Sequence, residues 1–153
     1  YYEPFMAYVP KDHRLFPEKF IDNTDLQEND LLLLNEGHCF RNSVINLCKN
    51  FFDKNSEKSV KLESGSFETL IRLSNQGFGM TLVPYLTSLE IKNEENKDCV
   101  KPFSRPQPMR EISLVHHRTH LKISIINALA KCVQETIPSH MLENKDGDVI
   151  KPY

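Results

Sequence analysis

Apolar residues follow two alternating patterns along this chain, short runs typical of strands and longer periodic stretches typical of helices. Four apolar runs predict strands at residues 5–9, 31–34, 80–83 and 112–116, and a shorter alternating run predicts another at 59–62. The run from Leu31 to Leu34 is apolar at every position, as in a strand buried on both faces. Strands that alternate with helices predict an α/β fold, a sheet covered by helices.

Three stretches have apolar residues at helical spacing. The clearest is residues 41–53, where the apolar stripe consists of Val44, Leu47, Cys48, Phe51 and Phe52. A second helix is predicted over residues 67–76, with Ser64 or Ser66 as its N-cap and Gly77 at its end. A third is predicted from about residue 121 to Pro138. We expect loops over 11–30 and 90–98, and a polar, flexible tail over 141–153.

Composition narrows the class of protein. The 153 residues are 39% apolar and 26% charged, which describes a globular chain of one domain or two small lobes. The longest aliphatic run is only residues 31–34, so we expect no membrane span, no secretory signal and a cytoplasmic location. Nineteen basic residues against 21 acidic ones leave no positive surplus, so this chain alone is not expected to bind DNA or RNA.

The four cysteines, at positions 39, 48, 99 and 132, carry the most chemical information. None belongs to a C-x-x-C pair, and a chain of this size does not need disulfides to fold, so we expect free thiols. Cys132 lies on the apolar stripe of the third predicted helix and is expected to be an inert core residue. Cys99 is expected to be similarly inert.

Cys39 has a different setting, because it lies between a predicted strand and the clearest predicted helix, after the turn Glu36-Gly37-His38. Ligands of open α/β sheets bind at this place, beyond the carboxyl end of a strand. The start of the helix, together with His38 and Arg41, would favour a thiolate. The alternative is that Cys39 is simply part of a loop, and its position alone does not decide between the two.

Cys48 shares the apolar stripe of the same helix, so we expect it to point into the core. Nine residues of helical rise separate it from Cys39 by about 13 Å, whereas a disulfide needs Cα atoms within about 7 Å. If the two thiols ever join, the start of the helix must unwind. Such a bond would act as a conformational switch.

The histidines at 116, 117 and 120 are a weaker candidate, for a metal site. Adjacent residues of a strand face opposite ways, and no carboxylate or thiol stands at ligand spacing, so we expect no metal here. The chain also lacks the G-x-S-x-G and H-E-x-x-H motifs and a phosphate-binding loop.

The segment LLLLNEGHCFRN, residues 31–42, resembles the redox-active segment of the peroxide-sensing LysR-type transcriptional regulators. The second cysteine, nine residues after Cys39, agrees with that resemblance. Residues 66–70 with 77–84 resemble the helix–glycine–strand passage common to the family, and residues 106–115 resemble its return strand with an arginine. The similarity extends from about residue 6 to 140. Its specific part is Gly-His-Cys-x-Arg with the second cysteine.

The resemblance implies a regulatory domain of the periplasmic-binding-protein type, built of two Rossmann-like lobes, with the second lobe complete and the first partial. Residues 1–9 would be a strand of the first lobe that enters the hinge, and residues 10–112 the second lobe with both redox cysteines. Residues 113–140 would return to the first lobe as a strand and a helix, followed by the flexible tail 141–153. The winged helix-turn-helix that binds DNA in the family would lie outside these residues.

The resemblance also implies roles for individual residues. Cys39 matches the peroxidatic cysteine and Cys48 the resolving one. His38 and Arg41 are neighbours of the thiolate, and Arg110 matches the arginine that supports it. Asn42 stands where relatives often have an aspartate linked to the peroxide reaction.

By this resemblance the chain is a sensor of hydrogen peroxide and not an enzyme. Peroxide would oxidise Cys39 to a sulfenic acid, the disulfide with Cys48 would form, and altered packing would control transcription of oxidative-stress genes. No cofactor and no metal are implied. The expected partners are a second copy in a homodimer or homotetramer, DNA through the winged helix-turn-helix, and RNA polymerase, with no membrane contact.

Three other functions remain open from the sequence. An ordinary LysR-type sensor would bind a small metabolite in the same crevice. A thiol peroxidase would use the same chemistry with turnover, although a resolving cysteine on a core stripe requires refolding in each cycle and suits a switch better. A periplasmic solute-binding protein is disfavoured by the expected absence of a signal segment.

Overall fold

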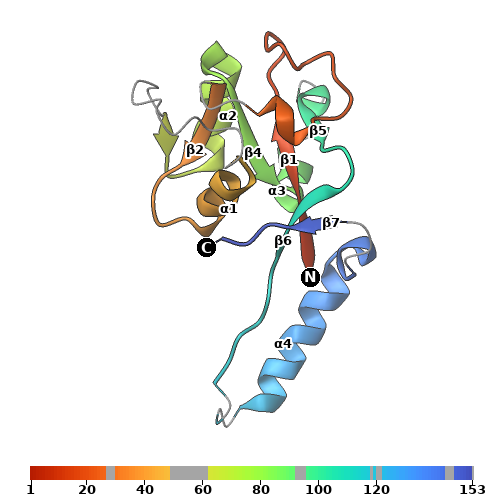
Figure 1. Cartoon of the computed structure of the whole chain (residues 1–153). Coiled ribbons are helices and arrows are strands. Elements are labelled where there is room, and N and C mark those ends of the chain that lie inside the picture. Colours follow the sequence, from red (N-terminus) through yellow and green to blue (C-terminus); the bar gives the residue numbers. More distant parts are fainter. Residues whose placement is uncertain are drawn as a thin grey trace.

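The computed structural model describes residues 1–26, 30–48, 62–91, 96–117, 119, 122–143 and 147–152. Within them, a seven-stranded sheet has the order β3-β2-β4-β1-β6-β7, with β5 also paired to β1 (Figure 1). The strands are β1 (Tyr2–Tyr8), β2 (Leu31–Leu34), β3 (Glu63–Ser64), β4 (Met80–Pro84), β5 (Val100–Pro102), β6 (Gln107–Glu111) and β7 (Gly147–Val149). The α-helices are α1 (Cys39–Cys48), α2 (Phe67–Leu73), α3 (Tyr85–Ile91) and α4 (Ile123–Thr136).

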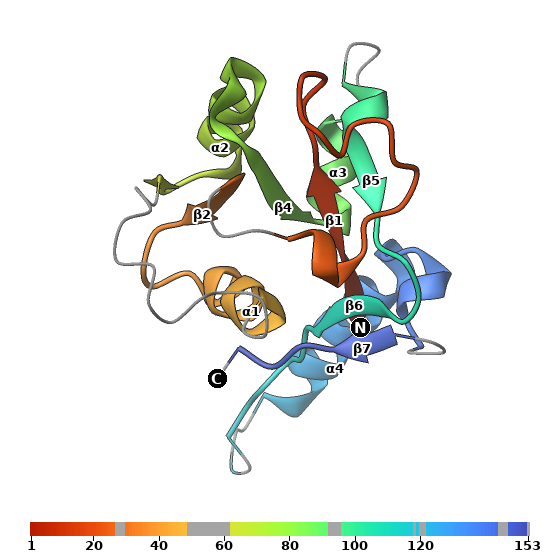
Figure 2. The same ribbon diagram turned by 45° about the horizontal axis from the view of Figure 1, so that its top comes forward.

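Strand β1 connects the two parts of this sheet. Its second half pairs antiparallel with β4 and β5, and its first half, residues 2–4, pairs antiparallel with β6. Strand β2 is parallel to β3 and β4, and β6 is parallel to β7. The two views show α1, α2 and α3 beside β1, β2 and β4, whereas α4 extends away from them (Figures 1 and 2). The predicted α/β class is therefore confirmed.

The hydrophobic core lies between these strands and helices α1 and α2. All four leucines of β2 are buried, as the continuous apolar run predicts. Strand β1 contributes Phe5 and Ala7, and α1 contributes its apolar stripe. The stripe residues that the structure describes are all at least nine-tenths buried: Val44, Leu47 and Cys48. The first helix is thus fixed by its packing against the sheet.

The first two helices agree with the sequence in type and differ slightly in extent. Helix α1 begins at Cys39, two residues before the predicted start, and the predicted end at residue 53 lies outside the described residues. Most of the predicted strand 59–62 lies outside them as well. Ser66 is the N-cap of α2, since its Oγ accepts a hydrogen bond from the Thr69 backbone N–H at 3.3 Å. Gly77, at φ +84°, follows in the turn that closes this segment.

The predicted strand over residues 112–116 is wrong. The strand in this region is β6, residues 107–111, and residues 112–116 have no regular structure, with Leu114 and Val115 exposed. Pairing with β1 on one side and β7 on the other fixes the position of β6. Those partners are distant in the sequence, so the local apolar pattern could not reveal them.

The polar segments also contain structure that the sequence does not predict. Helix α3 directly follows β4 and extends to Ile91, inside the expected loop 90–98. The segment 141–153, interpreted from the sequence as a flexible tail, includes buried Met141 and strand β7. The Ile150 N–H donates to the Met109 carbonyl at 2.8 Å, which extends the pairing with β6. This C-terminal segment, residues 147–152, is therefore held against the sheet.

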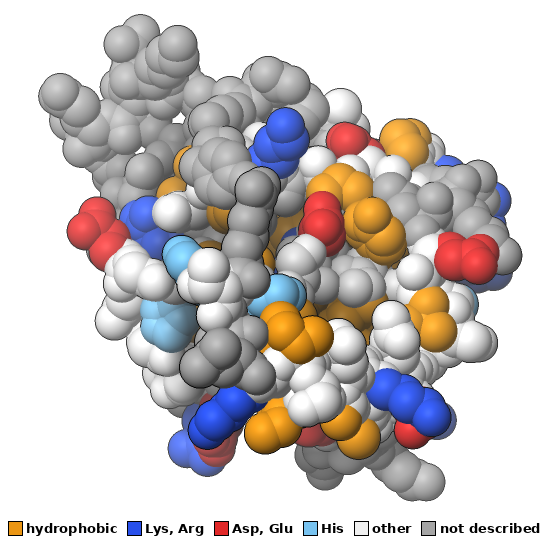
Figure 3. All heavy atoms as spheres, turned by 90° about the horizontal axis from the view of Figure 1, so that it is seen from below, with side chains coloured by type: hydrophobic (Ala, Val, Ile, Leu, Met, Phe, Trp, Pro, Cys, Tyr) orange, Lys and Arg blue, Asp and Glu red, His pale blue; other side chains and the backbone are white. Residues whose placement is uncertain are grey.

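Helix α4 confirms the third predicted helix but not the burial of its stripe. Ile125 is 62% exposed and Leu129 is 51% exposed. Cys132 is exposed too, so the expectation of a core cysteine is wrong. Figure 3 shows hydrophobic side chains at the surface of the molecule seen from the side where α4 lies. In the described parts of the chain, no helix has the length and apolar character for crossing a membrane.

Candidate functional site

Cys39 opens onto a cavity of about 360 Å³. The cavity is formed by three segments that are distant in the sequence: the first turn of α1, the end of β6 with the residues after it, and the C-terminal segment. The lining residues are Cys39, Phe40, Ser43, Arg110, Glu111, Ile112, Ser113, Val149, Ile150, Lys151 and Pro152. Figure 1 shows the C-terminal segment running from β7 past α1.

The position of Cys39 follows from the turn between β2 and α1. Gly37 has φ +94°, a left-handed conformation that glycine adopts without steric cost. The Asn35 N–H donates to the Ser64 carbonyl at 2.9 Å, and the Arg41 N–H donates to the His38 carbonyl at 3.0 Å. The chain therefore turns sharply after β2 and enters α1 at Cys39, where a helix favours anionic groups. The predicted location of this cysteine, after a strand and at the start of a helix, is confirmed.

Arg110 is the second predicted site residue in this cavity. Its guanidinium donates to Oε2 of Glu3 from Nε at 2.9 Å and from Nη2 at 2.7 Å. The guanidinium carbon also lies 5.2 Å from the ring centre of Phe40, the residue next to Cys39. This distance is within the range of a cation–π contact. Arg110 is thus held between a carboxylate and an aromatic ring at the edge of the cavity.

The structure does not bring His38 and Arg41 into the lining of this cavity. His38 is exposed in the turn before α1. Arg41 is paired instead with Glu63, with 2.7 Å between Nη2 and Oε1, which links α1 to β3. Their predicted roles beside the thiolate remain predictions.

Cys48 is at the other end of α1 and is completely buried. Burial raises the pKa of this thiol from 9.0 to about 12, because the thiolate loses its hydration. Both Cys39 and Cys48 are free thiols. A ten-residue helix separates them by about 13 Å, well beyond the reach of a disulfide. The predicted burial of Cys48 is confirmed.

Sequence reasoning missed three contributors to the site. Phe40 stacks on Phe5 with ring centres 5.0 Å apart and meets Phe67 edge-on at 5.3 Å. Glu3 binds Arg110, and the C-terminal segment forms one wall of the cavity. The only sequence signal for that wall is the apolar pair Val149 and Ile150 in an otherwise polar stretch.

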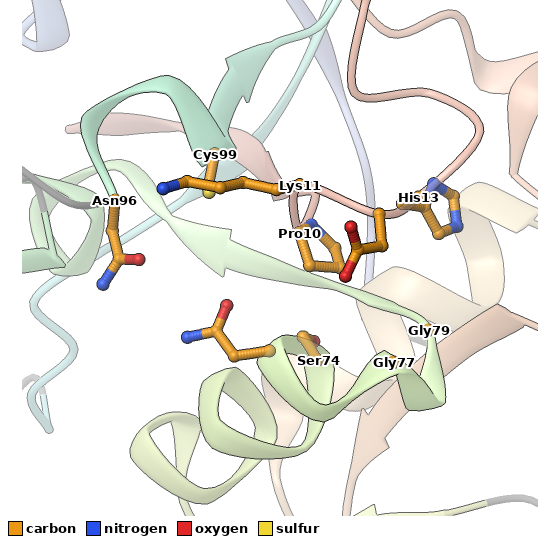
Figure 4. Close-up of a pocket in the computed structure, with 10 residues that line it drawn as sticks. Pro10, Lys11, His13, Ser74, Gly77, Gly79, Asn96 and Cys99 are labelled. Carbon is orange, nitrogen blue, oxygen red and sulfur yellow. The ribbon is translucent and has the colours of Figure 1, made fainter.

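A second cavity, of about 460 Å³, lies elsewhere and contains none of the predicted site residues. Figure 4 shows Pro10, Lys11 and His13 on one side and Ser74 with Gly77 on the other. Asn96 and Cys99 also line it. Burial raises the pKa of the Cys99 thiol, in agreement with the inert role predicted for that residue.

No group of metal-binding side chains occurs among the residues that the structure describes. His116 and His117 are exposed in the segment after β6, and His120 lies outside the described residues. The ring of His117 is within 2.7 Å of the Thr119 hydroxyl.

The LysR substrate binding domain family matches residues 1–138. The chain therefore belongs to this family, and its periplasmic-binding-protein-like α/β fold agrees with that assignment.

Within the family, the chain is similar to OxyR. Crystal structures of OxyR from Porphyromonas gingivalis include a mutant with a TM-score of 0.82 and 29% identity, covering 97% of this chain and 67% of that one. The crystal structure of the reduced form of OxyR has a TM-score of 0.72 and 26% identity, covering 92% of this chain and 63% of that one. The resemblance noted from the sequence is confirmed.

Curated relatives show the same similarity to OxyR-type regulators. The hydrogen peroxide-inducible genes activator of Dickeya chrysanthemi is 30% identical over 141 residues, covering 91% of this chain and 44% of the relative. The DNA-binding transcriptional dual regulator OxyR of Escherichia coli K12 is 28% identical over 140 residues, covering 90% of this chain and 44% of the relative. The chain spans less than half the length of these two relatives.

Proposed function

We propose that this chain is the redox-sensing part of a LysR-type transcriptional regulator that responds to hydrogen peroxide. One observation carries the proposal: an exposed thiol and a buried thiol occupy the two ends of one helix, and the exposed one opens into a cavity that also contains an arginine. The names of the relatives, hydrogen peroxide-inducible genes activators, support the choice of oxidant.

The chemistry takes place in two steps. The Cys39 thiolate attacks one oxygen of hydrogen peroxide, the O–O bond breaks, and the departing hydroxide takes a proton to become water. Cys39 becomes a sulfenic acid. The sulfur of Cys48 then attacks the Cys39 sulfur, the S–O bond breaks, and a second water leaves with the proton of Cys48. The two thiols lose two electrons in total, which reduce one peroxide.

The second step requires α1 to open. With a pKa of about 12 and no exposure, Cys48 is a poor nucleophile while the helix is intact. Its distance from Cys39 is also too large for a bond. Opening the helix solves both difficulties together, because it hydrates Cys48 and lets the two sulfurs approach. The disulfide then holds a different packing of the same sequence, which is the switch. A cellular dithiol resets it.

In this proposal residues 1–9 and 113–140 belong to the first lobe and residues 10–112 to the second, followed by the segment 141–153. A winged helix-turn-helix outside these residues binds DNA in the cytoplasm, and the regulator works as a homodimer or homotetramer that contacts RNA polymerase. We assign His38, Arg41 and Arg110 to the surroundings of the thiolate, and of these three Arg110 lines the cavity. No cofactor or metal takes part.

The disulfide is tested by adding one equivalent of hydrogen peroxide to the reduced chain and mapping its peptides by mass spectrometry. We expect a Cys39–Cys48 link. In Cys48→Ser, oxidation should stop at a sulfenic acid on Cys39, whereas Cys132→Ser, which removes the other exposed thiol, should behave like the unchanged chain. A persistent sulfenic or sulfinic acid at Cys39 beside free Cys48 would contradict the disulfide step.

Peroxide consumption separates a sensor from a thiol peroxidase. With excess dithiol present, a sensor consumes peroxide slowly, because every cycle requires α1 to open and close again. A peroxidase would consume many equivalents rapidly, and that result would overturn the non-enzymatic function.

A further inference from the structure

The carboxylate of Glu3 is almost completely buried, with 1% of its side chain exposed. Burying a charge is costly unless the charge is paired and hydrogen-bonded. Glu3 meets both conditions. Its Oε2 accepts two hydrogen bonds from Arg110, at 2.9 and 2.7 Å, and its Oε1 accepts one from the Leu86 N–H at 3.0 Å, in the first turn of α3. Three strong donors therefore hold this carboxylate in one orientation.

The strand pairing explains why these two residues meet. Glu3 on β1 is directly opposite Arg110 on the antiparallel neighbour β6. Strand β1 is also paired with β4 and β5, so Glu3 is carried by an internal strand of the sheet. Arg110 is one residue from the end of β6, and residues 112–117, which follow the strand, have no regular structure. Glu3 thus lies on a strand with partners on both sides, and the arginine that it binds lies near the end of the five-residue strand β6.

The guanidinium group of Arg110 therefore has little freedom to change its orientation at the cavity. Nε and Nη2 are bound by Glu3, and one face of the group is near the Phe40 ring. The remaining nitrogen, Nη1, takes no part in these two bonds, and Arg110 lines the same cavity as Cys39. A donor fixed before the reaction stabilises developing negative charge better than a mobile one, because it needs no reorganisation during the reaction.

We propose that Glu3 is a positioning residue: it holds Arg110 in the orientation in which the guanidinium supports the reaction of Cys39 with peroxide. This inference rests on the proposed function and adds a residue to it. Glu3 itself does not line the cavity. It acts through Arg110, which stabilises the Cys39 thiolate and the hydroxide that leaves when the O–O bond breaks.

A double-mutant cycle on the rate constant of Cys39 oxidation tests this inference. The initial rate is measured with excess peroxide and a sulfenic-acid probe, in a Cys48→Ser background that stops the reaction at the first step. We expect Glu3→Gln to slow the reaction by about tenfold, and Arg110→Ala to slow it at least as much. The double variant should be no slower than Arg110→Ala alone, because Glu3 acts only through that arginine. Multiplicative losses, or an unchanged rate in Glu3→Gln, would overturn the inference.

Two controls separate positioning from general damage. Glu68→Gln removes an exposed carboxylate that pairs with Arg72, and it should leave the rate unchanged. If Glu3→Gln does not fold, Arg110→Lys tests the same interaction through its other partner. The lysine keeps the positive charge but cannot donate two hydrogen bonds in the fixed geometry of a guanidinium, so it should also slow the reaction by about tenfold. A normal rate in Arg110→Lys would overturn positioning.

The outcomes also distinguish this inference from the proposed function. If Cys39 of the unchanged chain does not react with peroxide, the proposed function is wrong and the inference falls with it. If Cys39 reacts and Arg110→Ala is slow while Glu3→Gln is normal, the proposed function stands and only the role of Glu3 is wrong.

Discussion

Cys39 and Cys48 begin and end the same helix, yet they differ in the properties that decide how a thiol reacts. Cys39 is exposed at the helix start, and Cys48 is completely buried with its pKa raised to about 12. The remaining two cysteines repeat this contrast, because Cys99 is buried and Cys132 is exposed. The chain therefore contains its own controls for thiol reactivity.

Alkylation of the native reduced chain should follow this contrast. With iodoacetamide near pH 8, we expect Cys39 and Cys132 to be modified first and Cys48 and Cys99 much later, since exposure and thiolate formation control the rate. Peptide mass spectrometry over a time course measures the order. In denaturant, the difference between the cysteines should disappear. Equal rates for Cys39 and Cys48 in the native chain would show that α1 opens without oxidation.

Burial of Cys48 also predicts a loss of stability in alkali. The unfolded thiol releases its proton above pH 9.0, whereas the folded one keeps it until about pH 12. Between these values deprotonation stabilises the unfolded state relative to the native state, so the free energy of unfolding falls. From this residue we expect a loss of at most about 1.4 kcal/mol per pH unit in that interval. Below pH 9 the contribution is fully present.

Urea unfolding of the reduced chain and of Cys48→Ala, from pH 7 to pH 11, measures this effect. Cys48→Ala should be less stable at pH 7, and the difference should narrow above pH 9. Cys132→Ala, which removes an exposed thiol, is the matched control and should be about as stable as the unchanged chain at pH 7. A difference for Cys48→Ala that does not change with pH would show that the thiol does not titrate in this way.

At the scale of elements, α1 is held in place on two of its sides. Its apolar stripe packs in the core, and its polar side is tied to the C-terminal segment, because Asn46 Nδ2 donates to the Lys151 carbonyl at 2.7 Å. The same segment forms a wall of the Cys39 cavity and pairs with β6 through β7. Opening α1 would therefore break the link between the helix and the end of the chain.

Replacing Asn46 should loosen that segment. Asn46→Ala removes the bond to Lys151, and we expect faster hydrogen–deuterium exchange over residues 147–152, with a stability loss of about 1 kcal/mol. Asn42→Ala, at an exposed position on the same helix, should leave the exchange of these residues unchanged. Unchanged exchange in Asn46→Ala would show that pairing with β6 alone holds the segment.

The sequence predicts the elements whose cause is local. Each of these features depends on residues close together in the sequence: the apolar run of β2, the apolar stripe of α1 and the Ser66 cap of α2. The position of Cys39 at a helix start is local in the same sense. The Glu3–Arg110 pair joins residues 107 positions apart, and β7 depends on its pairing with β6. Such features arise from register between distant strands, which periodicity along one segment does not contain.

For the whole molecule, the main departure from an ordinary globular surface is α4. A helix with Ile125 at 62% and Leu129 at 51% exposure presents an apolar stripe to water, and Leu114, which is also exposed, lines the same cavity as Leu129. Contiguous apolar surface of this kind favours association. The sequence predicts this stripe correctly and its burial wrongly, because periodicity shows which side of a helix is apolar and not what covers it.

Polar substitution on this stripe should increase the solubility of the chain without weakening its fold. In Ile125→Lys/Leu129→Glu we expect weaker binding of an apolar dye and less light scattering at high concentration, with a thermal unfolding midpoint within a few degrees of the unchanged chain. Val44→Lys, in the core, is the contrasting variant and should unfold the chain. A large stability loss in the α4 double variant would mean that the stripe is already covered.

The course of the C-terminal segment has a practical consequence. Lys151 and Pro152 line the cavity onto which Cys39 opens, so a group attached at either position starts beside that thiol. A bulky fusion partner placed there would obstruct the cavity, whereas a small fluorophore would be near enough to sense whether α1 is intact. Positions 151 and 152 are thus poor places for a bulky label and good places for a small optical reporter of the state of α1.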